Sequence, residues 1–173
     1  MKYCSKCGNQ LIIRNEENEG PTPYCPKCNE FKYPQFNDAI SAVLTNKEHN
    51  KILLIQQYNR TNNILVAGYI SKGEKPSETL IREIKEEVNL DVNAYAYNDS
   101  SYYEKSNTLI HNFIAEVNDE DFKLNEKEVD YANWYSISEA KKAIYPNSLA
   151  QRFLNQVIDK LENQQFVFEK SEH

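Results

Sequence analysis

The sequence of 173 residues lacks the long apolar runs that mark membrane-spanning and secreted proteins. No stretch of about 18 apolar residues occurs, which argues against a membrane-spanning helix. The N-terminus, Met1-Lys2-Tyr3-Cys4, has no apolar run that could serve as a signal peptide. We therefore expect a cytoplasmic protein with no membrane partner.

Motifs that depend on histidine or glycine are also missing. The three histidines, His49, His111 and His173, are scattered and have no nucleophile beside them, so a Ser-His-Asp arrangement is not indicated. The four glycines form neither a P-loop nor a dinucleotide-binding fingerprint. The net charge of −6 argues against a protein that holds nucleic acid by bulk positive charge.

The composition that remains is that of a globular protein, with 40% hydrophobic and 27% charged residues. The length allows one domain and a small appendage. Four cysteines stand in the first 28 residues as two pairs, Cys4-Ser-Lys-Cys7 and Cys25-Pro-Lys-Cys28, with 17 residues between the pairs. Four thiolates close a tetrahedral shell around Zn²⁺ with no place for substrate, so this spacing predicts a structural zinc ribbon. Two disulfides are the alternative, which the paired spacing and the missing signal peptide disfavour.

The boundaries follow from polar and proline-containing segments. We expect the ribbon in residues 1–35, the main domain in 36–165 and a C-terminal tail in 166–173. Apolar runs of strand length predict strands at 39–44, 51–56, 64–66, 92–97, 108–117 and 131–135. Helical spacing predicts helices at 76–88, 137–144 and 148–161. Few helices among many strands indicate an α+β domain.

The helix expected at 76–88 carries an acidic cluster. Pro76 suits the first helical position, and Asn89 tolerates the left-handed conformation that ends a helix. At about 100° per residue, Glu83, Glu86 and Glu87 lie together at the edge of the apolar face, with Glu87 nearest to it. That apolar face consists of Leu80, Ile81, Ile84 and Val88.

Converging carboxylates repel one another unless a cation lies between them. Their hard oxygen atoms suit Mg²⁺ or Mn²⁺, which also bind phosphate oxygens and can activate a water molecule. Arg82 can orient a carboxylate by ion pairing, and Gly68 and Gly73 allow the preceding loop to fold tightly. The alternative is an ordinary solvated helix with surface salt bridges.

The segment Gly68-x₅-Glu74-x₇-Arg82-Glu83-Ile84-x-Glu86-Glu87-x-Asn89-Leu90 resembles the Nudix box, in which a glycine stands where this chain has Asn89. The resemblance implies a Nudix fold, with a mixed sheet sandwiched between helices. It also implies hydrolysis of a nucleoside diphosphate linked to another moiety.

Nearly the whole chain resembles the NADH pyrophosphatase (NAD⁺ diphosphatase) family within this group. The resemblance rests on the ribbon before the box, on Tyr33-Pro34-Gln35, on Leu65-Val-Ala67-Gly68, and on Lys127-Glu128-x₃-Ala132-Asn133-Trp134. The family's Ser-Gln-Pro-Trp-Pro-Phe-Pro motif is absent, and Ser100 to Asn107 stand in that region. The reaction type is therefore expected, whereas the substrate is left open.

The resemblance also implies roles for particular residues. Glu83 and Glu87 match metal-binding carboxylates, and Glu86 matches a neighbour that holds a further ion or acts as base. The backbone carbonyl of Ala67 and the remote Glu128, whose competitor is Glu126, match further metal ligands. Tyr33 and Ala150 match substrate-contacting positions, and Tyr103 is a further candidate that can stack on a base or on nicotinamide.

Together these features predict an Mg²⁺- or Mn²⁺-dependent pyrophosphohydrolase with structural Zn²⁺. It would cleave NADH or NAD⁺ first, or else ADP-ribose or a similar compound, into two monophosphates, with Glu86 or Glu87 as the base. The alternative is a nucleotide-sensing or RNA-binding module that uses the ribbon, to which several lysines give a locally basic character. Processing of NAD-capped RNA would combine hydrolysis with RNA binding. The family resemblance further implies a homodimer.

Overall fold

The computed structural model describes residues 1–171, and it divides into two compact units, Met1–Phe36 and Asn37–His173. Residues 172–173, the end of the expected tail and with it His173, lie outside the described residues. None of the described helices is long and apolar enough to cross a membrane.

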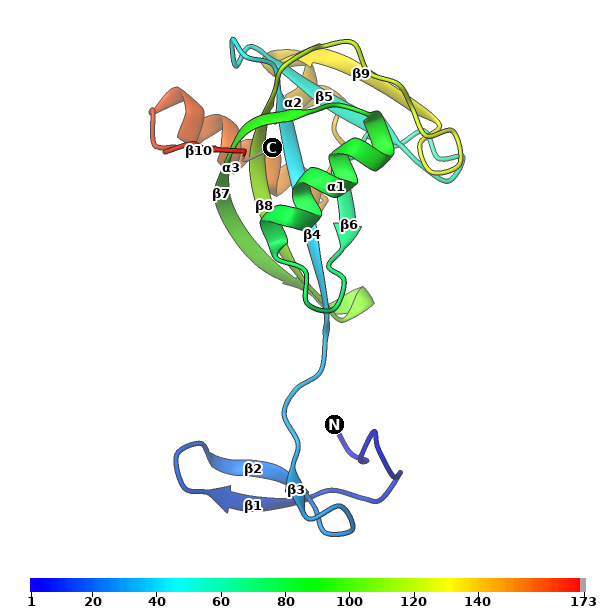
Figure 1. Ribbon diagram of the computed structural model, residues 1–173, viewed down its shortest axis with the longest axis vertical. Helices are drawn as coiled ribbons and strands as arrows, with labels where there is room; N and C mark the ends of the chain where they lie inside the picture. The colour runs from blue at the N-terminus through cyan, green and yellow to red at the C-terminus, as the bar shows by residue number, and fades with distance from the viewer. Residues whose placement is uncertain (172–173) are drawn as a thin grey trace. The chain divides into compact units, whose positions relative to one another are not determined.

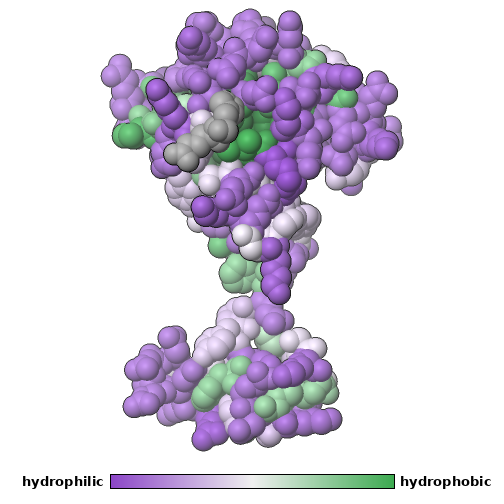
Figure 2. All heavy atoms as spheres, in the orientation of Figure 1, coloured by the Kyte–Doolittle hydropathy of each residue, from purple (hydrophilic) through white to green (hydrophobic). Residues whose placement is uncertain are grey.

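The N-terminal unit is a small antiparallel sheet of three strands (Figure 1). Its strands are β1 (Ile12–Glu16), β2 (Gly20–Cys25) and β3 (Glu30–Phe31). Tyr24 is buried and packs edge-on against Phe31, with ring centroids 5.1 Å apart. Apolar surface remains visible on this unit (Figure 2), and β1 leaves Ile12 and Ile13 50% and 67% exposed.

The second unit is built on one mixed sheet with strand order β10-β7-β8-β4-β5-β9, and β6 pairs with β4 beside this path. The parallel pair is β4 with β8, whereas the other pairs are antiparallel. The strands are β4 (Asn37–Thr45), β5 (Lys51–Gln56), β6 (Val66–Tyr69), β7 (Val92–Tyr103), β8 (Thr108–Val117), β9 (Tyr131–Ser136) and β10 (Glu169–Lys170). The helices are α1 (Pro76–Val88), the short 3₁₀ helix η1 (Glu104–Ser106), α2 (Ile137–Ala143) and α3 (Leu149–Glu162).

The sheet lies between two helical layers because its central strands are apolar on both faces. Ile40 and Leu44 of β4 belong to the core under α1, whereas Val43 between them belongs to the core under α2 and α3. The α1 core receives Leu80, Ile84 and Val88, and the other core receives Phe153, Leu154, Val157 and Ile158. Strand side chains alternate between faces, so one apolar strand serves two layers. The expected sandwich is confirmed.

Three elements differ from the expectation. Strand β7 continues to Tyr103, because its second half pairs with the start of β8. Strand β6 begins at Val66, and Ile64 makes only an isolated bridge to Ile55. The segment treated as a tail packs Phe166 and Phe168 on the α3 core, and Glu169–Lys170 pairs with β7. All three depend on partners distant in sequence.

Candidate active site and metal centres

Helix α1 positions three carboxylates on one wall of a cavity of about 510 Å³. The helix begins at Pro76, where the Lys75 amide donates to Glu78 Oε2 at 2.9 Å. It ends at Asn89, which has the expected left-handed conformation (φ 55°) and whose amide donates to the Lys85 carbonyl. The acidic residues in the lining are Glu83, Glu86, Glu87 and Glu128.

Glu87 is the most buried of these carboxylates, with 3% of the residue exposed. Gln57 Nε2 donates to its Oε1 at 2.8 Å, whereas its buried Oε2 has no hydrogen-bond partner among the described residues. Burial raises the pKa of Glu87 to about 8; the Gln57 hydrogen bond opposes this, and the charges of Glu83, Glu128 and Glu86 add to it. A buried carboxylate oxygen without a donor is what a bound cation would satisfy, so these residues fit a divalent ion.

Glu83 is held between an arginine and a glycine. Arg82 Nη1 donates to Glu83 Oε1 at 2.7 Å, and burial raises the pKa of Glu83 in spite of this contact. A Cβ atom at Gly68 would lie 1.9 Å from Glu83 Cδ. Only glycine at this position leaves the carboxylate its place against strand β6.

Arg82 joins the first part of the box to the helix. Its Nε and Nη2 donate to the two oxygens of Glu74 at 2.7 and 3.0 Å, and its Nη1 also donates to Glu86 Oε2 at 3.0 Å. The Arg82 hydrogen bonds lower the pKa of Glu74 to about 2. The box therefore uses one carboxylate, Glu74, to fix the arginine that orients the cavity carboxylates.

The loop between β8 and β9 docks on the C-terminal end of α1 and brings Glu128 into the same cavity. The amides of Lys123 and Asn125 donate to the carbonyls of Val88 and Glu87, both at 3.0 Å. These are helix-end carbonyls with no partner inside the helix. The competing Glu126 is not among the residues that line the cavity.

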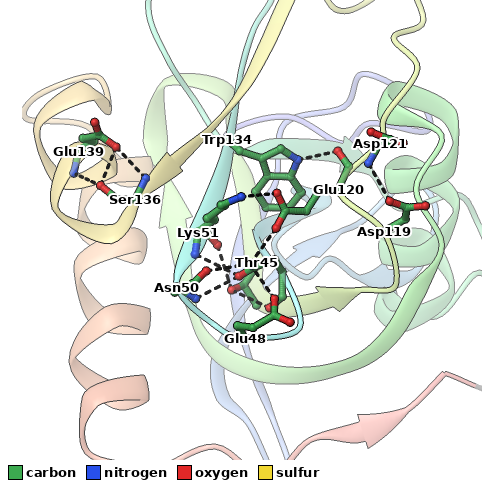
Figure 3. A network of polar contacts seen from close by, with 11 residues as sticks. Thr45, Glu48, Asn50, Lys51, Asp119, Glu120, Asp121, Trp134, Ser136 and Glu139 are labelled. Carbon is green, nitrogen blue, oxygen red and sulfur yellow. Dashed lines mark hydrogen bonds and ion pairs between the residues drawn. The ribbon is translucent and has the colours of Figure 1, made fainter.

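The start of this loop is fixed by a polar network, shown in Figure 3. Trp134 Nε1 donates to the Glu120 carbonyl at 2.8 Å, and Lys51 Nζ lies 2.5 Å from Glu120 Oε2. Asn46 Nδ2 donates to Glu120 Oε1 at 3.0 Å. Trp134, which belongs to the sequence motif that contains Glu128, is thus hydrogen-bonded to the loop that carries Glu128.

A second cavity, of about 720 Å³, adjoins the first, since Ala67 and Ile110 line both. Tyr103 and Ala150, two of the expected substrate-contacting residues, line this second cavity together. Tyr33 belongs to the N-terminal unit, where its hydroxyl donates to Glu16 Oε1 at 2.6 Å. The expected Mg²⁺ or Mn²⁺ ligands thus line the first cavity, and two of the three expected substrate residues line the second.

Sequence reasoning missed Gln57 and Tyr58, which also line the first cavity. They follow strand β5 and belong to no motif. Gln57 meets Glu87 from a position 30 residues away. No local pattern could have indicated this contact.

The four cysteines of the N-terminal unit form a second candidate metal centre. Their sulfur atoms all lie within 4.8 Å of one another. Cys4 and Cys28 are 3.9 Å apart and Cys7 and Cys25 are 3.5 Å apart, so none is bonded in a disulfide, whose sulfurs are about 2.05 Å apart. Tetrahedral thiolates at about 2.3 Å from zinc are about 3.8 Å apart, so the arrangement fits such an ion.

The two cysteine pairs have the same backbone turn. The Gly8 amide donates to the Cys4 carbonyl and the Asn29 amide to the Cys25 carbonyl, both at 2.8 Å. Gly8 and Asn29 both have positive φ angles, 71° and 57°. Each turn directs two sulfurs to one point, as the spacing predicts.

Comparison with known proteins identifies the group to which this chain belongs. The model of the NUDIX domain matches residues 35–155, more than half of the chain. The chain is a member of the NUDIX domain family. This membership agrees with the box on α1 and confirms the resemblance to the Nudix family.

Among curated proteins, this NUDIX domain protein is 27% identical over 159 residues to proteins named NAD-capped RNA hydrolase NudC. Examples come from Escherichia coli O9:H4 (strain HS) and Shigella boydii serotype 18 (strain CDC 3083-94 / BS512). The match covers 91% of this chain but 60% of those relatives, so the chain spans less than two thirds of their length.

Solved structures show the same fold at low identity. A NUDIX hydrolase from Nitrosomonas europaea matches with a TM-score of 0.68 and 23% identity, over 98% of this chain and 97% of that one. The NUDIX domain of Shewanella oneidensis NrtR, complexed with ADP ribose, matches with a TM-score of 0.63 and 17% identity, over 80% of this chain and 94% of that one. These likenesses establish the NUDIX fold of the main domain.

Proposed function

We propose that this protein is a metal-dependent pyrophosphohydrolase that cleaves the diphosphate bond of a dinucleotide or another nucleoside diphosphate derivative into two monophosphates. One observation carries the proposal. Glu87, whose buried Oε2 has no donor among the described residues, lines a cavity together with Glu83, Glu86 and Glu128. Family membership gives the same reaction class.

Glu83 and Glu87 are buried, whereas Glu86, Glu128 and Ala67 are exposed. Glu83, Glu87, Glu128 and the Ala67 carbonyl would hold Mg²⁺ or Mn²⁺, an ion that neutralises charge on a diphosphate and supplies an acidic water when bound. The Glu86 side chain is 51% exposed and keeps one oxygen bonded to Arg82. Between the two candidate bases, we assign Glu86 to accept the proton, because Glu87 is buried and suited to be a ligand.

The first substrate to expect is NADH or NAD⁺, followed by ADP-ribose or a similar compound. The name of the curated relatives supports an NAD-type diphosphate, and the complex of the Shewanella oneidensis domain supports ADP-ribose. The cavity beside the metal site offers Tyr103 and the backbone of Ala150 to one half of such a molecule. Tyr33 stays a proposed substrate residue from the N-terminal unit.

The decisive experiment is an assay with Mn²⁺ and a panel of NADH, NAD⁺, ADP-ribose and NAD-capped RNA, in which release of AMP, or of 5′-monophosphate RNA from the capped substrate, is measured. We expect the wild type to release monophosphate from at least one member. Glu87→Gln should lower its kcat by about a hundredfold or more, the size of effect seen when a group that stabilises the transition state is removed. Equal, slow release by both proteins from every substrate would exclude catalysis and leave the nucleotide-sensing alternative.

For the cysteine cluster we propose a structural Zn²⁺, because four thiolates leave no open coordination position. The free thiols also fit a cytoplasmic location. A role for the ribbon in RNA binding has less support, since Lys6 and Lys32 both pair with Glu30 and are partly neutralised. A homodimer is proposed on the family resemblance alone.

A further inference from the structure

The loop that follows β5 contains two successive residues in the left-handed conformation. Tyr58 has φ 59° and Asn59 has φ 55°. Asparagine accepts this conformation readily, whereas an aromatic residue with positive φ is strained. Such strain persists only where the surroundings impose it, and it is concentrated at functional sites.

Packing of the ring does not offset this strain. Tyr58 is 73% exposed, the highest exposed fraction among the tyrosines. Within residues 1–171, neither its hydroxyl nor its ring makes a hydrogen bond, ion pair or ring contact. Folding therefore gains little from having a tyrosine here.

The conformation is imposed by contacts on both sides of Tyr58. The Asn59 amide donates to Asp130 Oδ2 at 2.6 Å, and the Asp130 amide donates back to the Gln56 carbonyl at 2.8 Å. On the other side, Gln57 donates to Glu87. The loop is thus tied both to the segment that carries Glu128 and to the proposed metal site.

Tyr58, whose backbone is held in this way, lines the same cavity as Glu87 and Glu128. We propose that Tyr58 binds substrate by stacking on a heterocyclic ring of the nucleotide whose diphosphate lies at the carboxylates. The inference rests on the proposed function and adds a substrate-binding residue to it. An exposed aromatic ring on a backbone that is held in place suits a planar base or a nicotinamide ring, since stacking requires only a π-face.

The test compares Tyr58→Asn with Tyr58→Phe on the panel substrate that the wild type cleaves best. Asparagine tolerates positive φ, so Tyr58→Asn should leave the thermal unfolding midpoint unchanged or higher. Its KM should rise roughly five- to a hundredfold, the range expected for one lost base–aromatic stack. Tyr58→Phe keeps the ring and should retain the wild-type KM within about twofold. The matched control is Gln164→Asn, which alters another exposed residue with positive φ (52°), lines none of the three described cavities and should not change KM.

Two results would overturn the inference. One is an unchanged KM in Tyr58→Asn, which would show that the ring does not contact substrate. The other is an equal loss in Tyr58→Phe, which would assign binding to the hydroxyl instead of the ring. If the wild type cleaves no panel member, the proposed function itself fails, and this outcome is distinct from both.

Discussion

The ionisation of Glu87 predicts how the stability of metal-free protein depends on pH. Its folded pKa of about 8 lies above the ordinary value of 4.5, so the folded protein binds more protons than the unfolded chain between these values. The free energy of unfolding of metal-free protein should therefore fall as the pH rises from about 4.5 to 8, by up to about 1.4 kcal/mol per pH unit. Urea unfolding at several pH values measures this slope.

Two comparisons separate Glu87 from other titrating groups. In Glu87→Gln the free energy of unfolding should depend less steeply on pH over the same range, because the amide does not titrate, while the raised pKa of Glu83 still contributes. Saturating Mg²⁺ should also reduce the slope, since the ionised carboxylate then has a partner. A slope that is unchanged in the variant would place the titrating group elsewhere.

Gly68 supports a prediction that separates binding from folding. Alanine there would place Cβ 1.9 Å from Glu83 Cδ, and the displaced atoms are the end of a flexible side chain. Gly68→Ala should therefore change the free energy of unfolding by less than about 1 kcal/mol. Moving the carboxylate should weaken Mn²⁺ binding by about 10- to 100-fold, as lost ligand positioning does. Calorimetric titration with Mn²⁺ measures this loss.

A double-mutant cycle with Glu83→Ala identifies the cause. If Gly68→Ala acts only by moving Glu83, it should add almost nothing to the loss of Mn²⁺ affinity already present in Glu83→Ala. Additive losses would instead indicate a general distortion of β6.

At the scale of elements, the C-terminal end of α1 is formed by Asn89, the one residue that departs from the Nudix box. Asn89 replaces the usual glycine in a left-handed position directly after Glu87 and Val88. Asn89→Ala should lower the free energy of unfolding by about 1 kcal/mol, because alanine is strained there, whereas Asn89→Gly should change it by less than about 0.5 kcal/mol. Denaturant unfolding of the three proteins gives the comparison. Equal stability of the alanine and glycine variants would mean that the backbone conformation at this position is not fixed.

Helix α1 could be predicted almost completely because its information is local. A helical period places Glu83 and Glu87 on one side, and Pro76 and Asn89 mark the ends within the same 14 residues. Strand β10 could not be predicted, because two residues near the C-terminus gain their order only by pairing with Ala94 and Tyr95. The same holds for the site, where the box carboxylates follow from the sequence and Gln57 does not.

At the scale of the whole molecule, different interactions stabilise the ribbon and the NUDIX domain. Both hydrophobic cores of the second unit consist of residues that follow Phe36 in the sequence. The ribbon, in contrast, buries few large side chains, and the cysteines Cys4 and Cys25 are among its most buried residues. Units of such size usually need a metal or disulfides to fold.

The thiols themselves indicate that a cation is needed. Burial acts to raise the pKa of Cys4, but hydrogen bonds from the backbone amides of Lys6 and Cys7 outweigh it and lower this pKa to about 6. In contrast, hydrogen bonding to Cys7 and burial raise the pKa of Cys28 to about 12. The Cys28 thiol therefore ionises near neutral pH only beside a cation. Zinc binding supplies that charge and should be coupled to folding of the ribbon.

We accordingly predict one equivalent of zinc per chain and two separable unfolding events. A strong zinc chelator, or Cys4→Ser, should abolish the order of residues 1–36 while the NUDIX domain keeps its own thermal transition, within a few degrees of the wild type. Zinc analysis and amide hydrogen exchange measure the two effects, since exchange reports ribbon and domain amides separately. A purified protein without zinc, or a NUDIX domain that loses its exchange protection together with the ribbon, would contradict this division. With the ribbon unfolded, the panel assay would also show whether Tyr33 and its unit contribute to KM, which is the contribution that the family resemblance implies.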